Sequence, residues 1–307
     1  MRLGMIGLGR MGGDMSRRLL ADGHEVVVYD LSEAAVGALA AAGAHPARSV
    51  EDLVAQLSAP RVLWLMLPSG TVTESAFGEA LAALSEGDVL VDGANSHWKD
   101  SCERAERAAK RGVHFVDAGV SGGVWGLREG YNLMIGASPE AFGVLEPALK
   151  SLAPAGGYAH VGPAGSGHFV KMIHNGIEYA MMQAYGEGFE ALAAYPHAEL
   201  DLHQIARLWT RGSVVRSWLL ELAARALEKD VRLADVRAYV DDSGMGRWTV
   251  LYGVEAGVPM AAISAALFAR FSSRQTDSFA AKLAAALRNE FGGHALHRLP
   301  EGEREVE

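Results

Sequence analysis

The sequence predicts an α/β protein in which a doubly wound parallel sheet is followed by an all-helical domain. Short apolar runs alternate with helical segments over the first half of the chain, a pattern typical of a parallel sheet covered by helices. A glycine-rich turn follows the first apolar run. From His168 onward the pattern is mostly helical and rich in alanine. We therefore expect two domains, residues 1–164 and residues 165–307.

The chain begins with the parts of one βαβ unit. Residues 3–6 predict a strand, residues 7–12 (GLGRMG) a tight turn and residues 13–21 a helix. A second predicted strand, Glu25–Tyr29, ends at Asp30. A GxGxxG turn between a strand and a helix, with an acidic residue after the next strand, is the fingerprint of a Rossmann-type dinucleotide-binding domain.

Each glycine of the turn has a separate role in this fingerprint. Gly7 permits the tight turn, Gly9 lets backbone N–H groups approach a pyrophosphate, and Gly12 allows close helix–strand packing. The start of the helix offers unpaired N–H groups to the phosphates. The expected cofactor contacts therefore include the whole turn, namely Gly7, Leu8, Gly9, Arg10, Met11 and Gly12.

Asp30 indicates which dinucleotide is bound. A carboxylate at this position accepts hydrogen bonds from the adenosine ribose and repels a 2′-phosphate. Leu31 and Ser32 supply no arginine to hold that phosphate, so NAD is favoured. Arg10 lies in the turn as either a surface residue or an adenosine contact, so NADP stays open as the less favoured alternative.

Later apolar runs extend the predicted sheet, with helices expected at residues 51–58 and 99–111. Three loops, LPSG, GANS and VSGG, follow three of these runs. Ligands of a doubly wound sheet bind beyond the carboxyl ends of its strands, so we expect Leu67, Pro68 and Asn95 at the cofactor rim. The runs are Arg61–Leu67, Asp88–Asp92, His114–Ala118, Tyr131–Ile135 and Tyr158–Val161.

The long helix expected from Gly165 towards Tyr195 carries an unusual polar face. Lys171, His174, Asn175 and Glu178 stand at positions i, i+3, i+4 and i+7, which share one side of a helix. A buried face would normally be apolar there. An amine, an imidazole, an amide and a carboxylate together predict a site that has both a base and an acid. The alternative is a solvated face with an incidental Lys–Glu pair.

The composition excludes several other functions. The net charge of −9 is unsuited to a nucleic-acid surface, which needs clustered Lys and Arg. One cysteine, Cys102, forms no internal disulfide and fits a reducing cytoplasm. We expect no secretory leader, no membrane span and, because no ligand motif is present, no metal.

The motifs together resemble the decarboxylating 6-phosphogluconate dehydrogenases of the β-hydroxyacid dehydrogenase superfamily. GLGRMG, DAGVSGG (117–123) and GPAGSGHFVKMIHNG (162–176) are similar to superfamily motifs. KMIHNGIEY, DGANS (92–96) and RNEFGGH (288–294) resemble segments specific to this family. The resemblance covers essentially the whole chain, in a short form that lacks the enlarged helical domain of the long form.

The resemblance implies oxidative decarboxylation of 6-phosphogluconate to ribulose 5-phosphate and CO₂. Lys171 would act as the base that removes the hydroxyl proton, and burial would lower its pKa for that role. Glu178 would then act as the acid that protonates the carbon from which CO₂ has left. No metal is implied if Lys171 stabilises the enolate.

The resemblance also implies the substrate contacts. The carboxylate end would be held by the loop of Ser121, Gly122 and Gly123, with the polar groups of Asn95, His174 and Asn175. The phosphate end would be held by Tyr179, Arg270, Arg288 and His294, since a planar arginine fork suits a phosphate. In this family the last two come from a neighbouring subunit, which implies a homodimer or homotetramer.

One segment departs from the family pattern. The long form carries a Lys and a Thr in QKGTGKWT, whereas DDSGMGRWT (241–249) lacks both and has Arg247 in place of the later Lys. Fewer cations at the phosphate end leave open an unphosphorylated or differently phosphorylated sugar acid as the substrate. Two other functions also stay open. One is a non-decarboxylating β-hydroxyacid dehydrogenase of the 3-hydroxyisobutyrate type, and the other is a catalytically silent dinucleotide sensor.

Overall fold

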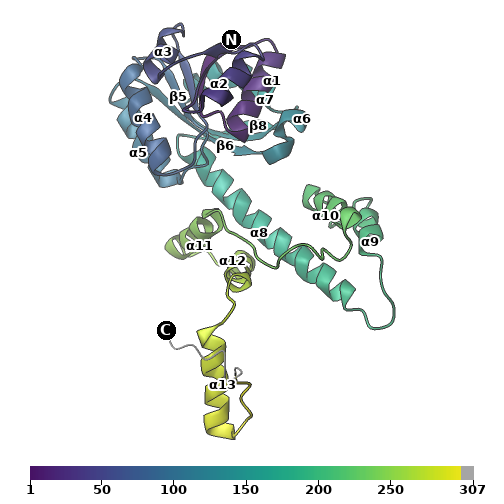
Figure 1. The fold of residues 1–307 in the computed structure, drawn as a ribbon. Coiled ribbons are helices and arrows are strands. Elements are labelled where there is room, and N and C mark those ends of the chain that lie inside the picture. Colours follow the sequence, from purple (N-terminus) through teal and green to yellow (C-terminus); the bar gives the residue numbers. More distant parts are fainter. Residues whose placement is uncertain (299–307) are drawn as a thin grey trace. The chain divides into compact units, whose positions relative to one another are not determined.

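The computed structural model describes residues 1–298 of the chain, which divides into two compact units. The first unit combines residues 1–179 with residues 244–263. The second combines residues 180–243 with the chain from residue 264 onward. The first unit contains the sheet and is shown with the rest of the chain in Figure 1.

Eight strands form one sheet, in the order β3-β2-β1-β4-β5-β6-β7-β8. The predicted α/β class with a doubly wound, mostly parallel sheet is confirmed. β7 and β8 run opposite to the other strands, because β7 pairs antiparallel with β6 and β8 pairs parallel with β7. Ten residues join β6 to β7, fewer than a parallel crossover needs. The strands are β1 (Arg2–Ile6), β2 (Glu25–Tyr29), β3 (His45–Pro46), β4 (Val62–Leu65), β5 (Val89–Asp92), β6 (His114–Ser121), β7 (Asn132–Gly136) and β8 (Tyr158–Gly162).

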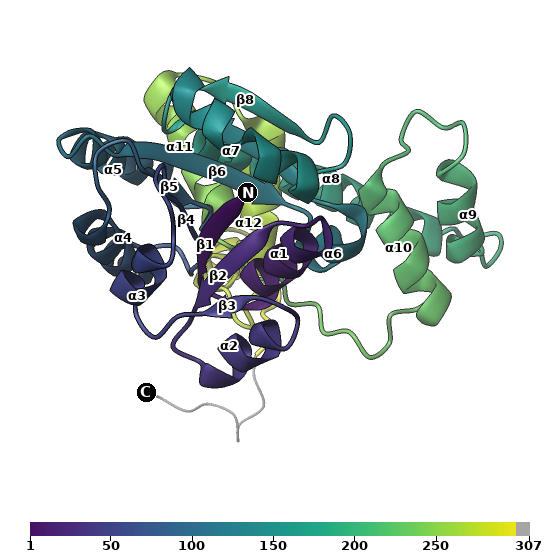
Figure 2. The same ribbon diagram turned by 90° about the horizontal axis from the view of Figure 1, so that it is seen from above.

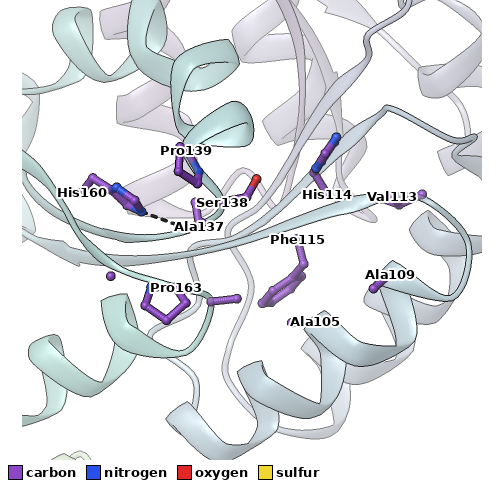
Figure 3. Close-up of a pocket in the computed structure, with 12 residues that line it drawn as sticks. Ala105, Ala109, Val113, His114, Phe115, Ala137, Ser138, Pro139, His160 and Pro163 are labelled. Carbon is purple, nitrogen blue, oxygen red and sulfur yellow. Dashed lines mark hydrogen bonds between the residues drawn. The ribbon is translucent and has the colours of Figure 1, made fainter.

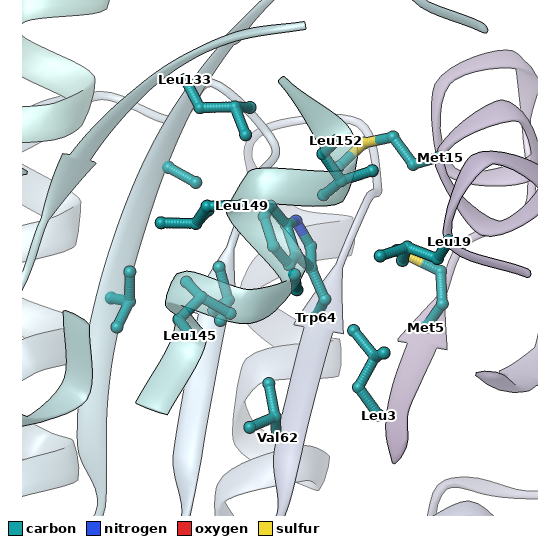
Figure 4. Close-up of a cluster of buried hydrophobic side chains, with 14 of the residues drawn as sticks. Leu3, Met5, Met15, Leu19, Val62, Trp64, Leu133, Leu145, Leu149 and Leu152 are labelled. Atoms are coloured by element: carbon teal, nitrogen blue, oxygen red, sulfur yellow. The ribbon is translucent and has the colours of Figure 1, made fainter. Parts of the chain in front are cut away.

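Helices cover both faces of the sheet (Figures 1 and 2). One face is covered by α1 (Arg10–Ala21), α2 (Glu33–Ala40) and α7 (Pro139–Leu152), and the other by α3 (Val50–Ala55), α4 (Thr71–Ala83) and α5 (Trp98–Ala109). Figure 4 shows the first of these two cores, where Trp64 packs among leucine and methionine side chains. Each fully buried leucine contributes roughly 1.5–3 kcal/mol. The short helices η1 (Gly123–Trp125) and α6 (Gly126–Glu129) join β6 to β7.

The first unit continues past the sheet into helical segments. It includes the start of α8 (Ser166–Ala193), all of α11 (Met245–Ala256) and the first residues of α12 (Ala261–Ser273). The buried Thr249 hydroxyl of α11 lies 2.9 Å from the Met172 carbonyl oxygen of α8. Edge-to-face contacts join Phe169 to Trp98 and Tyr252. The limit between domains at residues 164 and 165 stays a prediction.

The second unit is helical. α9 (Leu202–Trp209) and α10 (Trp218–Lys229) bury Ala206, Leu220, Ala224 and Leu227 against Tyr185 and Phe189 of α8. α13 (Phe279–Gly292) has no buried side chain in the part of the chain that the structure describes. Over that same part, none of the helices has the length and apolar character needed to span a bilayer.

Candidate active site

The glycine-rich turn is closely packed on one side and open on the other. A Cβ on Gly7, whose φ is +90°, would lie 2.3 Å from the Met66 carbonyl oxygen. A Cβ on Gly12 would lie 2.0 Å from the Gly7 carbonyl oxygen. Gly9, directly before α1, has no atom within 4 Å of its Cβ position. The turn therefore admits only glycine at its tight contacts and leaves room beside Gly9 for a pyrophosphate at the start of the helix.

Asp30 joins the end of β2 to the glycine-rich turn. Its Oδ2 accepts a hydrogen bond from the Leu8 N–H at 2.6 Å, and its Oδ1 accepts one from the Ser32 N–H at 2.8 Å. The carboxylate keeps unused lone pairs for a ribose hydroxyl, since each ionised oxygen can accept more than one bond. The neighbouring Leu31 is 91% exposed and has no group that could hold a 2′-phosphate. Arg10 is exposed, whereas Met11 is partly buried.

The loops after three adjacent strands meet at one edge of the sheet. Leu67 and Pro68 follow β4, Asn95 follows β5, and Ser121 ends β6. The Asn95 amide bonds to the backbone of Val120 twice, accepting from its N–H at 2.9 Å and donating to its oxygen at 3.1 Å. Two of the four hydrogen-bonding positions of the amide are thereby used, and two remain for a ligand.

The loop after β6 has a backbone that requires glycine. Gly122 and Gly123 both have positive φ, 142° and 51°. Tyr131 packs against this loop, because a Cβ on Gly122 would lie 3.0 Å from its ring. Burial raises the pKa of the Tyr131 hydroxyl to about 12. Ser121, Gly122 and Gly123 thus form a preshaped loop at the same edge as Asn95.

The start of α8 is anchored to β6 by a buried carboxylate that sequence reasoning did not single out. Asp117 Oδ1 accepts from the Gly165 N–H at 2.6 Å, and Oδ2 accepts from the His168 N–H at 2.7 Å. Burial raises the pKa of Asp117. A Cβ on Gly119 would lie 2.5 Å from the Lys171 Cβ, so β6 and α8 meet closely at Lys171. The motif DAGVSGG contains Asp117, but its bonding partners lie 48 and 51 residues away.

Lys171 is the buried amine of the predicted polar face. It is 4% exposed, and burial lowers its pKa to about 8 although the Glu178 carboxylate opposes this shift. A lysine whose pKa is near neutrality has a substantial neutral fraction and can accept a proton. Among its apolar neighbours on α8, Met172 is 1% exposed and Ile177 is 51% exposed.

The other members of the face are grouped along the next two turns of α8. The His174 Nδ1 atom lies 3.0 Å from Asn175 Oδ1 and 3.9 Å from Glu178 Oε2. The Asn175 Nδ2 atom lies 2.8 Å from the sulfur of Met245 at the start of α11. Tyr179 is buried against Gly246, where a Cβ would lie 2.5 Å from its ring.

Three predicted contacts for the phosphate end belong to the second unit. Arg270 Nη1 donates to the Asp241 carbonyl oxygen at 2.8 Å. Arg288 on α13 and His294 after it are both exposed. The Asn289 side chain donates to the His294 carbonyl oxygen at 2.7 Å, which closes the chain onto the end of α13.

A hollow of about 530 Å³ lies away from these residues (Figure 3). Phe115, Pro139, His160, Pro163 and several alanines line it, and it contains none of the predicted site residues. Over residues 1–298, His, Cys, Asp and Glu side chains form no group of three or more that could hold a metal ion.

The fold and this site define a dinucleotide-binding dehydrogenase of the β-hydroxyacid dehydrogenase superfamily. The model for the NAD-binding domain of 6-phosphogluconate dehydrogenase matches residues 2–162, and the model for the C-terminal domain of that enzyme matches residues 167–289. The chain belongs to the 6-phosphogluconate dehydrogenase family.

Similar proteins support this membership. The NAD(+)-dependent, decarboxylating 6-phosphogluconate dehydrogenase of Haloferax volcanii is 46% identical, and the match covers 97% of this chain and 99% of the Haloferax protein. A second NAD(+)-dependent, decarboxylating enzyme, from Bacillus subtilis, is 33% identical, and the match spans 88% of this chain but 61% of that longer protein. The solved 6-phosphogluconate dehydrogenase of Plasmodium falciparum has a TM-score of 0.82 at 28% identity, covering 98% of this chain and 67% of that one.

Proposed function

We propose that this protein oxidises 6-phosphogluconate with NAD and releases CO₂, forming ribulose 5-phosphate. The observation that carries the proposal is Lys171, a buried amine with a pKa of about 8, seven residues before Glu178 on α8. The similarity to the Haloferax volcanii and Plasmodium falciparum enzymes supports an NAD-dependent, decarboxylating activity.

In this proposal the glycine-rich turn, Asp30 and the rim after β4 hold the cofactor. NAD, when bound, supplies the acceptor for the hydride that leaves the substrate alcohol. Lys171, in its neutral form, takes the hydroxyl proton as that hydride leaves. The protonated Lys171 then donates a hydrogen bond to the new ketone, which stabilises the electron pair left behind as the C–C bond to CO₂ breaks. Glu178 finally gives a proton to the resulting enediol carbon.

The substrate contacts in this proposal are those that the family resemblance implies. Asn95, Ser121, Gly122, Gly123, His174 and Asn175 hold the carboxylate and hydroxyl groups. Tyr179, Arg270, Arg288 and His294 hold the phosphate, with the last two supplied by a second copy of the chain in a homodimer or homotetramer. The lone cysteine and the substrate's place in sugar metabolism favour a cytoplasmic location.

The alternative without CO₂ release has weaker support. The 3-hydroxyisobutyrate dehydrogenase of Mycobacterium tuberculosis matches with a TM-score of 0.70 at 24% identity, which shows a shared fold. A direct assay separates the alternatives: reduction of NAD and NADP is followed with 6-phosphogluconate, gluconate and 3-hydroxyisobutyrate, and CO₂ is measured in parallel. We expect NADH and CO₂ in equal amounts from 6-phosphogluconate. Formation of NADH without release of CO₂ would indicate a non-decarboxylating β-hydroxyacid dehydrogenase instead.

NAD is expected to be preferred over NADP because the Asp30 carboxylate repels a 2′-phosphate. Replacing Asp30 by Ser and Leu31 by Arg should move the ratio of kcat/KM towards NADP by about ten- to a hundredfold, the effect of one added charge-assisted hydrogen bond. Leu31→Arg alone is the matched control and should move the ratio less, because the carboxylate remains. A wild-type preference for NADP would contradict the role given to Asp30.

We expect kcat/KM for 6-phosphogluconate to rise as the pH increases through about 8, the pKa of Lys171. Below that pH the amine is protonated and cannot accept the hydroxyl proton, and above it the neutral base predominates. The measurement is kcat/KM for 6-phosphogluconate between pH 6 and 10, since this ratio reports the free enzyme. A profile that stays flat from pH 7 to 9 is inconsistent with Lys171 as the base.

Arg288→Ala is expected to raise KM for 6-phosphogluconate by roughly ten- to a hundredfold while kcat changes little, because a charge-assisted bond to the phosphate is lost. Lys282→Ala is the control, since Lys282 is on the same helix and pairs with Asp277. Equal turnover of gluconate and 6-phosphogluconate by the wild type would show that phosphate is not recognised.

A further inference from the structure

A buried charged cluster lies directly behind the loop that carries Asn95. Arg104 of α5 is 2% exposed, and Asp92 at the end of β5 is fully buried. Arg104 Nη1 donates to Asp92 Oδ2 at 2.7 Å and lies 3.0 Å from Ser96 Oγ. Ser96 Oγ donates to Asp92 Oδ2 at 2.8 Å, and Asp92 Oδ1 accepts from the Ala94 N–H at 2.9 Å. The cluster therefore holds the residues on both sides of Asn95.

The residue between these anchors has a backbone conformation that needs support. Asn95 has a φ of +52°, in the left-handed region that residues other than glycine adopt rarely. In that conformation its amide reaches the N–H and the carbonyl oxygen of Val120. Val120 directly precedes Ser121, Gly122 and Gly123. The loop after β5 and the loop after β6 are thus joined through Asn95.

We propose that Arg104 is a positioning residue for the reaction, acting by holding Asn95 and, through Val120, the Ser121–Gly123 loop in their binding geometry. This inference rests on the proposed function, because it assumes that both loops contact the substrate or the cofactor. The Arg104 guanidinium is buried, and it reaches the loop of Asn95 through the Asp92 carboxylate and the Ser96 hydroxyl. A planar fork is required here, because the Nε atom also donates to Glu74 at 3.0 Å. A lysine ammonium cannot reproduce these contacts.

A second Arg–Asp pair, in which the carboxylate is buried and the arginine is partly exposed, offers a control at the other end of the same strand. Arg61 Nη1 donates at 3.0 Å to Asp88 Oδ2, and Asp88, directly before β5, is 1% exposed. Substituting lysine for either arginine weakens the pairing of a buried carboxylate and should lower the melting temperature. Of the two arginines, Arg104 is the one that connects to Asn95, so replacing Arg104 should change kcat/KM and replacing Arg61 should not.

The experiment compares Arg104→Lys, Ser96→Ala, Arg61→Lys and Asn95→Ala with the double variant Asn95→Ala/Arg104→Lys. Each variant is checked for a folded state by thermal denaturation, and kcat and KM are measured for 6-phosphogluconate and NAD. Arg104→Lys is expected to lower kcat/KM for 6-phosphogluconate by roughly ten- to a hundredfold, because a small displacement of groups that position a substrate can lower the rate by that factor. Ser96→Ala, which keeps the buried ion pair, should cause a smaller loss in the same direction and guards against failure of Arg104→Lys to fold.

The double variant identifies the route of the effect. If Arg104 acts through Asn95, adding Arg104→Lys to Asn95→Ala should change kcat/KM by no more than about twofold, within the scatter of additive pairs. If the separate losses in kcat/KM multiply in the double variant, the proposal is overturned. It is also overturned if Arg104→Lys and Arg61→Lys both lower the melting temperature and both leave kcat and KM unchanged. A wild type that does not oxidise 6-phosphogluconate would instead refute the proposed function.

Discussion

Lys171→Met is expected to abolish measurable oxidation of 6-phosphogluconate, a loss of about two to four orders of magnitude if a slow background remains. The amine is the base in the proposed mechanism, and methionine has no group that can take the hydroxyl proton at neutral pH. Methionine is similar in length and fills the buried space beside Gly119, so the fold should survive. The measurement is NADH formation under saturating substrate.

NAD binding separates a chemical role of Lys171 from a structural one. The dissociation constant for NAD, measured by titration calorimetry, should be unchanged in Lys171→Met, because the glycine-rich turn and Asp30 are untouched. Lys110→Met, at an exposed position after α5, is the control and should retain wild-type activity. Substantial oxidation by Lys171→Met would show that another group removes the proton.

Glu178→Gln is expected to lower kcat by about a hundredfold or more, the usual size of a general-acid contribution. Glutamine keeps the shape and the hydrogen-bonding capacity of glutamate but cannot release a proton to the enediol carbon. The side chain is 35% exposed and lies 3.9 Å from His174 Nδ1, so the substitution should leave the core intact. Glu190→Gln, at an exposed position on the same helix, is the control.

Solvent deuterium tests the same step directly. The wild type in D₂O should incorporate one deuterium at C1 of ribulose 5-phosphate, because that carbon takes its proton from an exchangeable acid. Glu178→Gln should form this labelled product slowly while its affinity for NAD is unchanged. Full activity of Glu178→Gln would show that Glu178 is not the acid that protonates the enediol carbon.

Local patterns in the sequence predicted many of the strands and helices of the first unit and proposed its candidate site residues. The run EVVVY predicts a strand at residues 25–29, and β2 has these bounds. The helix expected from Gly165 towards Tyr195 is α8, Ser166–Ala193. The spacing of Lys171, His174 and Glu178 depends only on the 3.6-residue repeat of a helix, so the sequence predicts that they share a face. GLGRMG likewise predicts its own tight turn, because Gly7 has a φ of +90° and a Cβ on Gly12 would lie 2.0 Å from the Gly7 carbonyl oxygen.

Contacts between distant segments required the tertiary structure. The reversed direction of β7 and β8 is defined by the pairing of β7 with β6, which the sequence pattern of the separate runs did not predict. Asp117 accepts hydrogen bonds from backbone N–H groups 48 and 51 residues later, at the start of α8. The Asp92–Arg104 pair forms only because β5 and α5 lie against each other. The lowered pKa of Lys171 has the same origin, since burial by surrounding segments, and not its neighbours in sequence, removes water from the amine. The sequence alone therefore determined which groups are available for the chemistry, while the tertiary structure decided their burial, their partners and thus their reactivity.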